Sequence, residues 1–246
     1  LISRITVSIL CFYVLTGCRP AIETASAPSP QVTSQAVTTT QPELLVDEAR
    51  LNIYYPVDLT TDLTHLTDNQ KEMISLLIEA SMIMDDLFWQ QAFGEDKNVF
   101  LAKLTDPNVK HFAKINYGPW DRLNGDKPFL AGYDAKASGA QFYPSDISKE
   151  ALLNSSLNDK TGLYSVIERD DNGQLVATPY NQKYSAELQQ AASLLRQAAG
   201  LAEDPDFSNY LLLRADAFLS NQYQLSDLAW MDVKNNQIDV VIGPIE

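Results

Sequence analysis

The sequence predicts an α+β fold that is predominantly α-helical, with one β-hairpin and a terminal strand. Long segments between residues 68 and 221 carry apolar residues at helical spacing. The dipeptide Asn172-Gly173 separates two β-rich runs, which is the pattern of a hairpin turn. The chain has 246 residues, of which 45% are hydrophobic. That composition suffices for a genuine core in one large domain or two small ones.

The first eighteen residues have the pattern of a bacterial lipoprotein signal. Arg4 precedes an apolar run, Ile5 to Leu15, that is too short to span a membrane. The run ends in Leu15-Thr16-Gly17-Cys18, which resembles a lipobox, the motif whose cysteine receives lipid. We therefore expect residues 1–18 to be a signal peptide and Cys18 to be the lipidation site. The alternative is a short apolar segment that contains a cysteine by chance.

The predicted lipid would anchor the protein in the bacterial cell envelope. Several acyl chains on Cys18 would hold it stably in a membrane. Arg19, rather than Asp, follows the cysteine, which favours the periplasmic face of the outer membrane. Cys11 is removed with the signal, so the mature chain retains no free thiol for a disulfide.

Composition also divides the remaining chain. Residues 19–43 are rich in Ser, Thr, Ala, Pro and Gln, and they predict a disordered tether. Residues 44–246 form the expected folded part. The net charge of −14 leaves no basic stripe for phosphates, so we expect no nucleic-acid partner.

The first strong helix is predicted over about residues 68–92. Thr67 is a good N-cap, Gln70 completes a capping box, and Gly94 ends the helix. Apolar residues cover most of its circumference, which predicts deep burial. Those at helical spacing are Met73, Leu76, Leu77, Ala80, Met84, Leu87 and Phe88, and Ile74, Ile78 and Ile83 widen the stripe.

Two shorter helices are predicted next, around residues 96–104 and 107–115, with Pro107 suited to a first helical position after Asp106. Residues 117–143 then lack periodicity but are rich in aromatic residues. Such a long loop is usually functional or packed. Whether it lines a cleft or forms part of a core stays open from the sequence.

The C-terminal half predicts a hairpin, two helices and a strand. The hairpin covers residues 164–180 around its Asn-Gly turn. One helix begins near Ser185 and stops at Gly200, and the next begins at Asp204-Pro205 and runs to about residue 221. The two should pack as an antiparallel helical hairpin. The run Val240-Val241-Ile242 predicts a short buried strand before the Gly243-Pro244 bend.

No catalytic set can be assembled from motifs within the chain. His65 and His111 belong to no zinc-binding motif, and we expect both to be surface or capping residues. Glu79, Asp85 and Asp86 could offer oxygen ligands to a hard cation, but a polar stripe that meets partner side chains is the favoured interpretation.

Three stretches add a resemblance: INYGPWDRLNGDKPFL (115–130), GAQFYPSDISKEAL (139–152) and WMDVKNNQIDVVIGPIE (230–246). Together they resemble the bacterial branch of the dipeptidyl peptidase III family of zinc exopeptidases. The resemblance covers roughly residues 60–246 and implies the N-terminal part of a two-lobed zinc peptidase. Since the chain starts with Leu1 and holds no zinc motif, we expect a fragment that is inactive by itself.

The resemblance also implies the site residues. Glu246 matches the family's glutamate that pairs with the free α-amino group of the peptide substrate. The family's assisting Tyr would follow two residues later, and its His-Glu-x-x-Gly-His zinc ligands would lie downstream of residue 246. The implied reaction is zinc-dependent release of dipeptides from the N-terminus of short oligopeptides. The alternatives are a non-catalytic helical lipoprotein that serves as a binding or assembly module, and a family member that has lost its activity.

Overall fold

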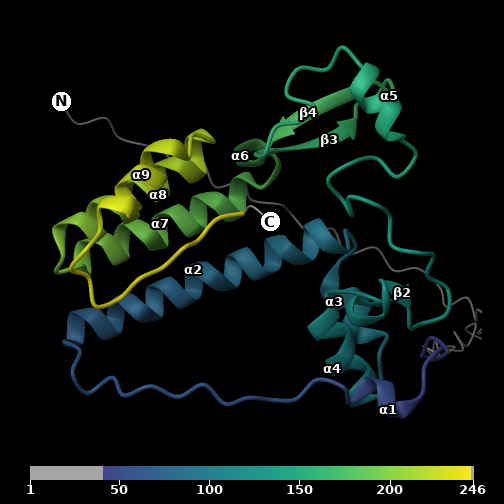
Figure 1. The fold of residues 1–246 in the computed structure, drawn as a ribbon, viewed down its shortest axis with the longest axis horizontal. Helices are drawn as coiled ribbons and strands as arrows, with labels where there is room; N and C mark the ends of the chain where they lie inside the picture. The colour runs from purple at the N-terminus through teal and green to yellow at the C-terminus, as the bar shows by residue number, and fades with distance from the viewer. Residues whose placement is uncertain (1–40, 245–246) are drawn as a thin grey trace, which may run out of the picture. The chain divides into compact units, whose positions relative to one another are not determined.

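The computed structural model describes residues 41–244. Cys18 and Glu246 therefore lie outside the described residues. Helices predominate and two small antiparallel sheets accompany them, which confirms the predicted α+β class. The described helices are α1 (Glu48–Leu51), α2 (Asp68–Ala92), α3 (Lys97–Ala102), α4 (Pro107–Asn116), α5 (Lys149–Asn154), α6 (Tyr180–Lys183), α7 (Ser185–Leu201), α8 (Pro205–Ser220) and α9 (Gln224–Asp232) (Figure 1).

Helix α2 has the predicted bounds and the predicted cap. The Thr67 side chain accepts a hydrogen bond from the backbone of Gln70, and the Gln70 side chain accepts one from the backbone of Thr67. Gly94 follows the helix with φ of +84°, a conformation that suits glycine. The expectation of deep burial is wrong for part of the helix, because Ile78, which was expected to widen the buried stripe, and Met82 are more than half exposed. One face of α2 packs on α7, and these two side chains lie on another.

Helices α3 and α4 begin where the sequence predicted, at Asp96 and Asp106, whose carboxylates cap them. The loop that follows α4 contains a short hairpin of β1 (Trp120–Asp121) and β2 (Lys127–Pro128). This region forms a hydrophobic cluster that we call the aromatic core. Its buried members are Leu51, Trp89, Phe93, Phe100, Leu101, Leu104, Val109, Phe112, Ala113, Phe129 and Leu130.

The open question about residues 117–143 is answered by this core. Phe129 is fully buried in it, and Tyr117, Trp120 and Tyr133 pack against it from the loop. The first residues of the described chain also join this region, since the Gln41 side chain accepts hydrogen bonds from the Thr105 backbone and hydroxyl. The loop is therefore part of a core.

The predicted β-hairpin is confirmed. Strand β3 (Ser165–Arg169) pairs antiparallel with β4 (Leu175–Pro179). The Asp170 carboxylate accepts hydrogen bonds from the backbone of Asn172 and Gln174, and Gly173 has φ of +75°. Asx-type bonding together with a positive-φ glycine fixes the tight turn.

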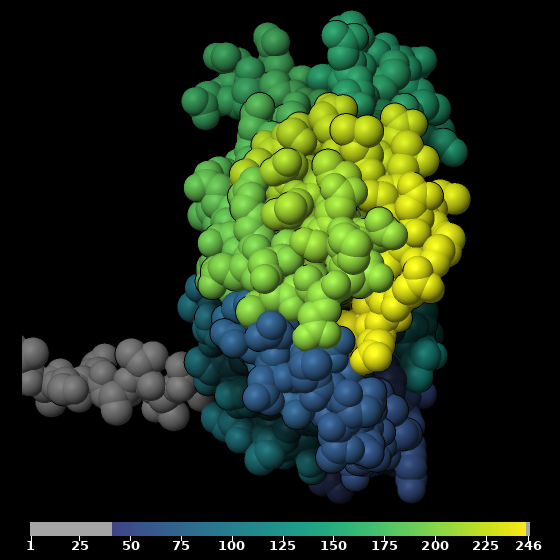
Figure 2. All heavy atoms as spheres, turned by 90° about the vertical axis from the view of Figure 1, so that its left-hand side faces the viewer, coloured from purple at the N-terminus to yellow at the C-terminus, as the bar shows by residue number. Residues whose placement is uncertain are grey.

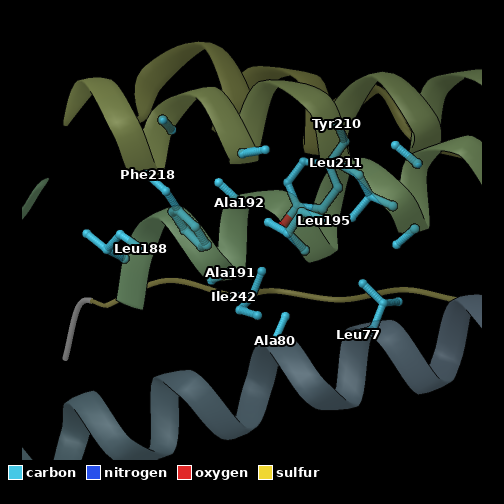
Figure 3. Packing of buried hydrophobic residues seen from close by; sticks show 14 of the residues in the cluster. Leu77, Ala80, Leu188, Ala191, Ala192, Leu195, Tyr210, Leu211, Phe218 and Ile242 are labelled. Atoms are coloured by element: carbon cyan, nitrogen blue, oxygen red, sulfur yellow. The ribbon is translucent and has the colours of Figure 1, made fainter. Parts of the chain in front are cut away.

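The predicted helical hairpin is also present. Helix α8 is capped by Asp204 and ends at Asn221, which has φ of +62°. Helix α7 runs one residue past Gly200, which does not have positive φ and so is not its stop. We call the cluster in this part the helical core (Figure 3). Its buried members are Met73, Leu77, Ala80, Leu87, Val166, Tyr180, Tyr184, Leu188, Ala191, Ala192, Leu195, Ala198, Ala199, Phe207, Tyr210, Leu211, Ala215, Ala217, Phe218, Tyr223 and Ile242.

The prediction of a terminal strand is wrong. Among the described residues after α9 no strand is present, although the chain is extended and Ile242 is buried. The segment lies between α2 and α7, so it has helices rather than a strand edge beside it (Figures 1 and 3). Its side chains alternate as the β-rich pattern requires, but the backbone has no ladder partner.

The surface view shows the chain after α9 (yellow) at the outside of the molecule, where it reaches α2 (blue) (Figure 2). None of the described helices is both long and apolar enough to cross a membrane.

Candidate functional site

The candidate site is the extended segment, residues 237–244, that leads to the predicted substrate-binding residue Glu246. Within it Ile242 is 5% exposed and enters the helical core, whereas Val241 is 75% exposed. Pro244 is buried as well. The segment is thus fixed by alternate side chains on its inner face up to the last described residue.

A buried amide holds the end of this segment. Gln91, in the last turn of α2, is 2% exposed, and its Nε2 donates a hydrogen bond of 2.7 Å to the Pro244 carbonyl oxygen. Its own backbone carbonyl accepts a hydrogen bond of 3.0 Å from the Gln141 backbone. Gln91 therefore joins α2 to two segments that are distant in sequence.

Tyr184, just before α7, completes the surroundings of this amide. Burial raises the pKa of its phenol to about 12, and a hydrogen bond with Gln91 acts in the opposite direction. The hydroxyl is therefore protonated at neutral pH. A neutral phenol beside a neutral amide gives the end of the segment an uncharged, hydrogen-bonded support.

The beginning of the segment is held by α9. The indole nitrogen Nε1 of Trp230 donates a hydrogen bond of 3.0 Å to Asp239 Oδ1. The same oxygen accepts a hydrogen bond of 2.8 Å from the Val240 backbone. The segment is therefore restrained at both ends, by Trp230 at one and by Gln91 at the other.

Helix α9 is in turn attached to α8 by a buried cation. Arg214 is 6% exposed, and its Nη2 donates to Asp227 Oδ1 at 2.6 Å. Its guanidinium lies 5.5 Å from the ring centre of Tyr210 and 5.6 Å from that of Tyr223. Burial raises the pKa of both phenols, so both are neutral at physiological pH. This arrangement stabilises a charge between two rings rather than preparing an acid or a base.

The other charged residues singled out in the sequence do not form a metal site. His65 and His111 are exposed, as expected. Asp85 accepts a hydrogen bond of 2.5 Å from the Tyr117 hydroxyl, and Asp86 forms an ion pair with Lys97. Asp85 and Asp86 therefore meet partner side chains, as the interpretation as a polar stripe predicted.

Residues 41–244 contain no group of three or more His, Cys, Asp and Glu side chains that could hold a metal ion. A zinc site, which needs at least three such ligands, does not fit the described part of the chain. A hollow of about 540 Å³ lies among residues 137–161 and is lined by no Asp, Glu or His.

The sequence motifs assign no role to Gln91, although its position on α2 indicates that it is buried. The buried stripe of α2 continues through positions 73, 77, 80 and 87 to 91, where a glutamine replaces an apolar residue. Arg214 likewise occupies a stripe position on α8, among Phe207, Leu211 and Phe218. A polar residue at a buried helical position needs a partner, so such positions indicate long-range contacts.

Comparison with known proteins adds two solved structures. The structure of dipeptidyl peptidase III (DPP III) from Caldithrix abyssi is 36% identical, has a TM-score of 0.73, and matches 79% of this chain and 39% of its own. That of the enzyme from Corallococcus sp. strain EGB is 33% identical, with a TM-score of 0.70, over 76% of this chain and 37% of its own. The chain therefore resembles DPP III in fold and sequence, as its own motifs predicted.

A curated plant protein is also similar. It is named Nudix hydrolase 3, from Arabidopsis thaliana, and is 28% identical over 81% of this chain and 34% of its own length. Because the match covers a third of a longer protein, the name does not say which activity the matched part carries. No protein-family model matches the chain. The chain spans about two fifths or less of the relatives described here.

Proposed function

We propose that this chain supplies the part of a zinc-dependent dipeptidyl peptidase that recognises the N-terminus of the substrate. The enzyme would release dipeptides from short oligopeptides. The observation that carries the proposal is the likeness to two DPP III structures, at 36% and 33% identity, over more than three quarters of the chain. Identity at this level accompanies the similar fold, so the likeness is more than a shared architecture.

The proposed role of Glu246 follows from the chemistry of a free N-terminus. A peptidase that removes two residues must bind a cationic α-amino group at a fixed distance from the bond that it cleaves. A carboxylate can accept a charge-assisted hydrogen bond from that ammonium group. The buried Pro244 turn, two residues earlier, offers a rigid base for such a carboxylate.

The zinc ion would supply the activated water for hydrolysis. Its ligands would lie outside residues 41–244, because the described part holds no suitable group. The contribution of this part is to bind and orient the peptide, and to carry the segment that ends in Glu246.

We also propose that Cys18 carries lipid and that the enzyme acts in the cell envelope. Replacement of Cys18 by Ser should move the protein from the membrane fraction to the soluble fraction and abolish labelling by palmitate. Retention of both properties in the variant would refute the anchor without affecting the peptidase proposal.

The activity can be tested on the complete polypeptide encoded by the gene. After purification, bound zinc and the release of dipeptides from peptides and from dipeptidyl naphthylamides should be measured. We expect cleavage that requires zinc and that N-acetylation of the substrate abolishes. A folded, zinc-loaded protein that releases no dipeptide would refute the proposal and favour a binding module or an inactive relative.

The role of Glu246 has its own variant. Glu246→Gln keeps the shape of the side chain but removes its charge, so KM for free peptides should rise at least about tenfold, since hydrogen bonds to charged groups are the stronger ones. An unchanged KM would exclude amine recognition by this residue.

A further inference from the structure

We propose that Gln91 is a positioning residue for substrate binding, because it fixes the backbone at Pro244, two residues before Glu246 in the sequence. The inference rests on the proposed function of Glu246 and adds a residue for which no motif gives a role. What Gln91 would determine is the place of the substrate's α-amino group relative to the cleaved bond.

The Gln91 amide donates to the carbonyl of Pro244 at 2.7 Å, and both residues are buried. Residue 246 is only two residues further along, a distance of at most about 7 Å in extended chain. Proline adds to the restraint because its ring fixes φ. A hydrogen bond at residue 244 therefore limits the positions available to the side chain at 246.

The Gln91 amide itself has little freedom to move. Gln91 lies in the last turn of α2, between Trp89 and Ala92, which are both buried. Its backbone carbonyl accepts the hydrogen bond from Gln141, and its side chain contacts the buried Tyr184. The donor is thus held by three separate segments of the chain, as a positioning group requires.

A glutamine at this buried position has an energetic cost. A buried amide without a partner is unfavourable, and an apolar residue would continue the α2 stripe more simply. The amide instead satisfies a backbone carbonyl 153 positions away in the sequence. Its partner lies two residues before the predicted amine-binding residue.

The neighbouring glutamine provides a matched control. Gln90 is exposed, and its Nε2 donates to Glu187 Oε1 at 3.2 Å on the surface. Gln90→Met and Gln91→Met make the same chemical change at adjacent positions of one helix. Methionine keeps the length and the flexibility of glutamine but cannot donate the hydrogen bond.

The first measurement is hydrogen exchange in the complete polypeptide. Gln91→Met should accelerate exchange about tenfold at the amides of Val241 to Gly243 and of residues 245 and 246, a factor that corresponds to a lost buried hydrogen bond. Gln90→Met should leave these rates unchanged, and α7 should exchange equally in both variants. Equal rates at residues 241–246 in the two variants would overturn the inference, whatever the enzyme activity.

The second measurement is kinetic. Gln91→Met should raise KM for dipeptidyl substrates about tenfold while kcat and zinc content stay within about twofold. A residue with a merely structural role would lower the active fraction, and hence kcat, at constant KM. A fall in kcat with constant KM would therefore overturn the inference.

A second variant keeps the inference testable if Gln91→Met folds poorly. In Gln91→Glu, the ionised carboxylate cannot donate to the Pro244 carbonyl, but the protonated acid can, and burial favours the protonated form. The KM of this variant relative to the unaltered enzyme should fall as pH is lowered from about 8 to about 5.5. A ratio that does not depend on pH would count against the hydrogen bond.

Failure of the two proposals can be distinguished. If the unaltered protein releases no dipeptides, the proposed function fails and the substrate role of Gln91 fails with it. If dipeptides are released but the Gln91 variants match Gln90→Met in exchange and KM, only the positioning role fails.

Discussion

The helical core and the aromatic core are built from different side chains, although α2 contributes to both. In the helical core, alanines occupy much of the contact between α2, α7 and α8, among them Ala80, Ala191, Ala192 and Ala215. In the aromatic core, rings fill the space between short elements, for example Phe93 and Phe100 with centres 4.7 Å apart. Small residues allow helices to approach closely, whereas large rings connect segments that have little regular structure of their own.

The two regions also differ in which member of an ion pair is buried. In the helical core the buried partner is the cation, Arg214, and its carboxylate Asp227 is half exposed. In the aromatic core the buried partner is the carboxylate, Asp121, which binds Arg50 through two hydrogen bonds of 2.5 and 3.0 Å. Each pair attaches a short helix, α9 or α1, to its core. Because alanines fill the helical core and large rings fill the aromatic core, we expect added volume to destabilise the helical core and lost volume to destabilise the aromatic core.

The largest effect is expected from loss of a ring in the aromatic core. Phe112 is fully buried, and its ring centre lies 4.9 Å from that of Phe129 and 5.7 Å from that of Tyr54. Phe112→Ala should lower the free energy of unfolding by about 3–5 kcal/mol, since the site loses contacts and gains a cavity. Urea unfolding measured by circular dichroism gives the value.

Phe112→Leu is the control for that variant, because it retains most of the volume and should cost less than about 1.5 kcal/mol. A loss below about 1 kcal/mol for Phe112→Ala would mean that the aromatic core collapses around missing volume, contrary to the comparison.

The second effect tests added volume in the helical core. Ala192 is fully buried on α7, whereas its neighbour Ser193 is exposed. Ala192→Leu should cost about 1–3 kcal/mol because the added methyl and methylene groups push neighbouring helices apart. Ser193→Leu, the same side chain one position away, should change stability by less than about 0.5 kcal/mol. Equal costs at the two positions, again from urea unfolding, would contradict the proposed close packing.

Three helices that combine a side-chain cap with an apolar stripe could be predicted from the sequence. The carboxylates of Asp106 and Asp204 and the hydroxyl of Thr67 cap α4, α8 and α2, and all three helices begin where expected. These signals are local, so a few residues determine them. Helix α9 has no side-chain cap, and its one buried residue is Ser226, while Leu225 and Leu228 face outward. Helix α9 therefore has neither a side-chain cap nor an apolar stripe, and the sequence does not predict it.

The terminal segment shows the limit of reasoning from periodicity. Its alternating pattern predicted a strand, and the burial of Ile242 agrees with the alternation. Alternation specifies which face is buried, but a strand also needs a hydrogen-bonding neighbour, which the sequence does not reveal. The contact of Gln91 with Pro244 could not be predicted for the same reason, since its two partners are far apart in the chain. Only the polar residue in an apolar stripe indicated that a partner existed.

A smaller effect is expected from the ion pair that attaches α9. Asp227→Asn leaves the buried Arg214 with a neutral acceptor and should cost about 1 kcal/mol, less than for a fully buried pair because Asp227 is half exposed. The control is Asp216→Asn, which removes an exposed pair with Arg196 from the same helix α8. That change should cost less than about 0.5 kcal/mol. An equal loss of stability in the two variants would mean that the burial of Arg214 does not make its ion pair stronger than the exposed one.

The smallest effect is expected on stability in alkaline solution, for which one tyrosine from each region is replaced. Burial raises the pKa of Tyr184 to about 12, and burial followed by the hydrogen bond to Asp85 raises that of Tyr117 to about 12. In the unfolded chain these phenols ionise at about pH 10. Their contribution to the free energy of unfolding is therefore fully present below that pH and is lost as the pH rises toward about 12. Tyr184 is buried in the helical core, whereas Tyr117 is half-buried. We therefore expect that, between about pH 9.5 and 11.5, stability decreases less steeply with pH in Tyr184→Phe than in Tyr117→Phe. Urea midpoints across this range would measure the difference, and a larger flattening for Tyr117→Phe would reverse the ranking of the two environments.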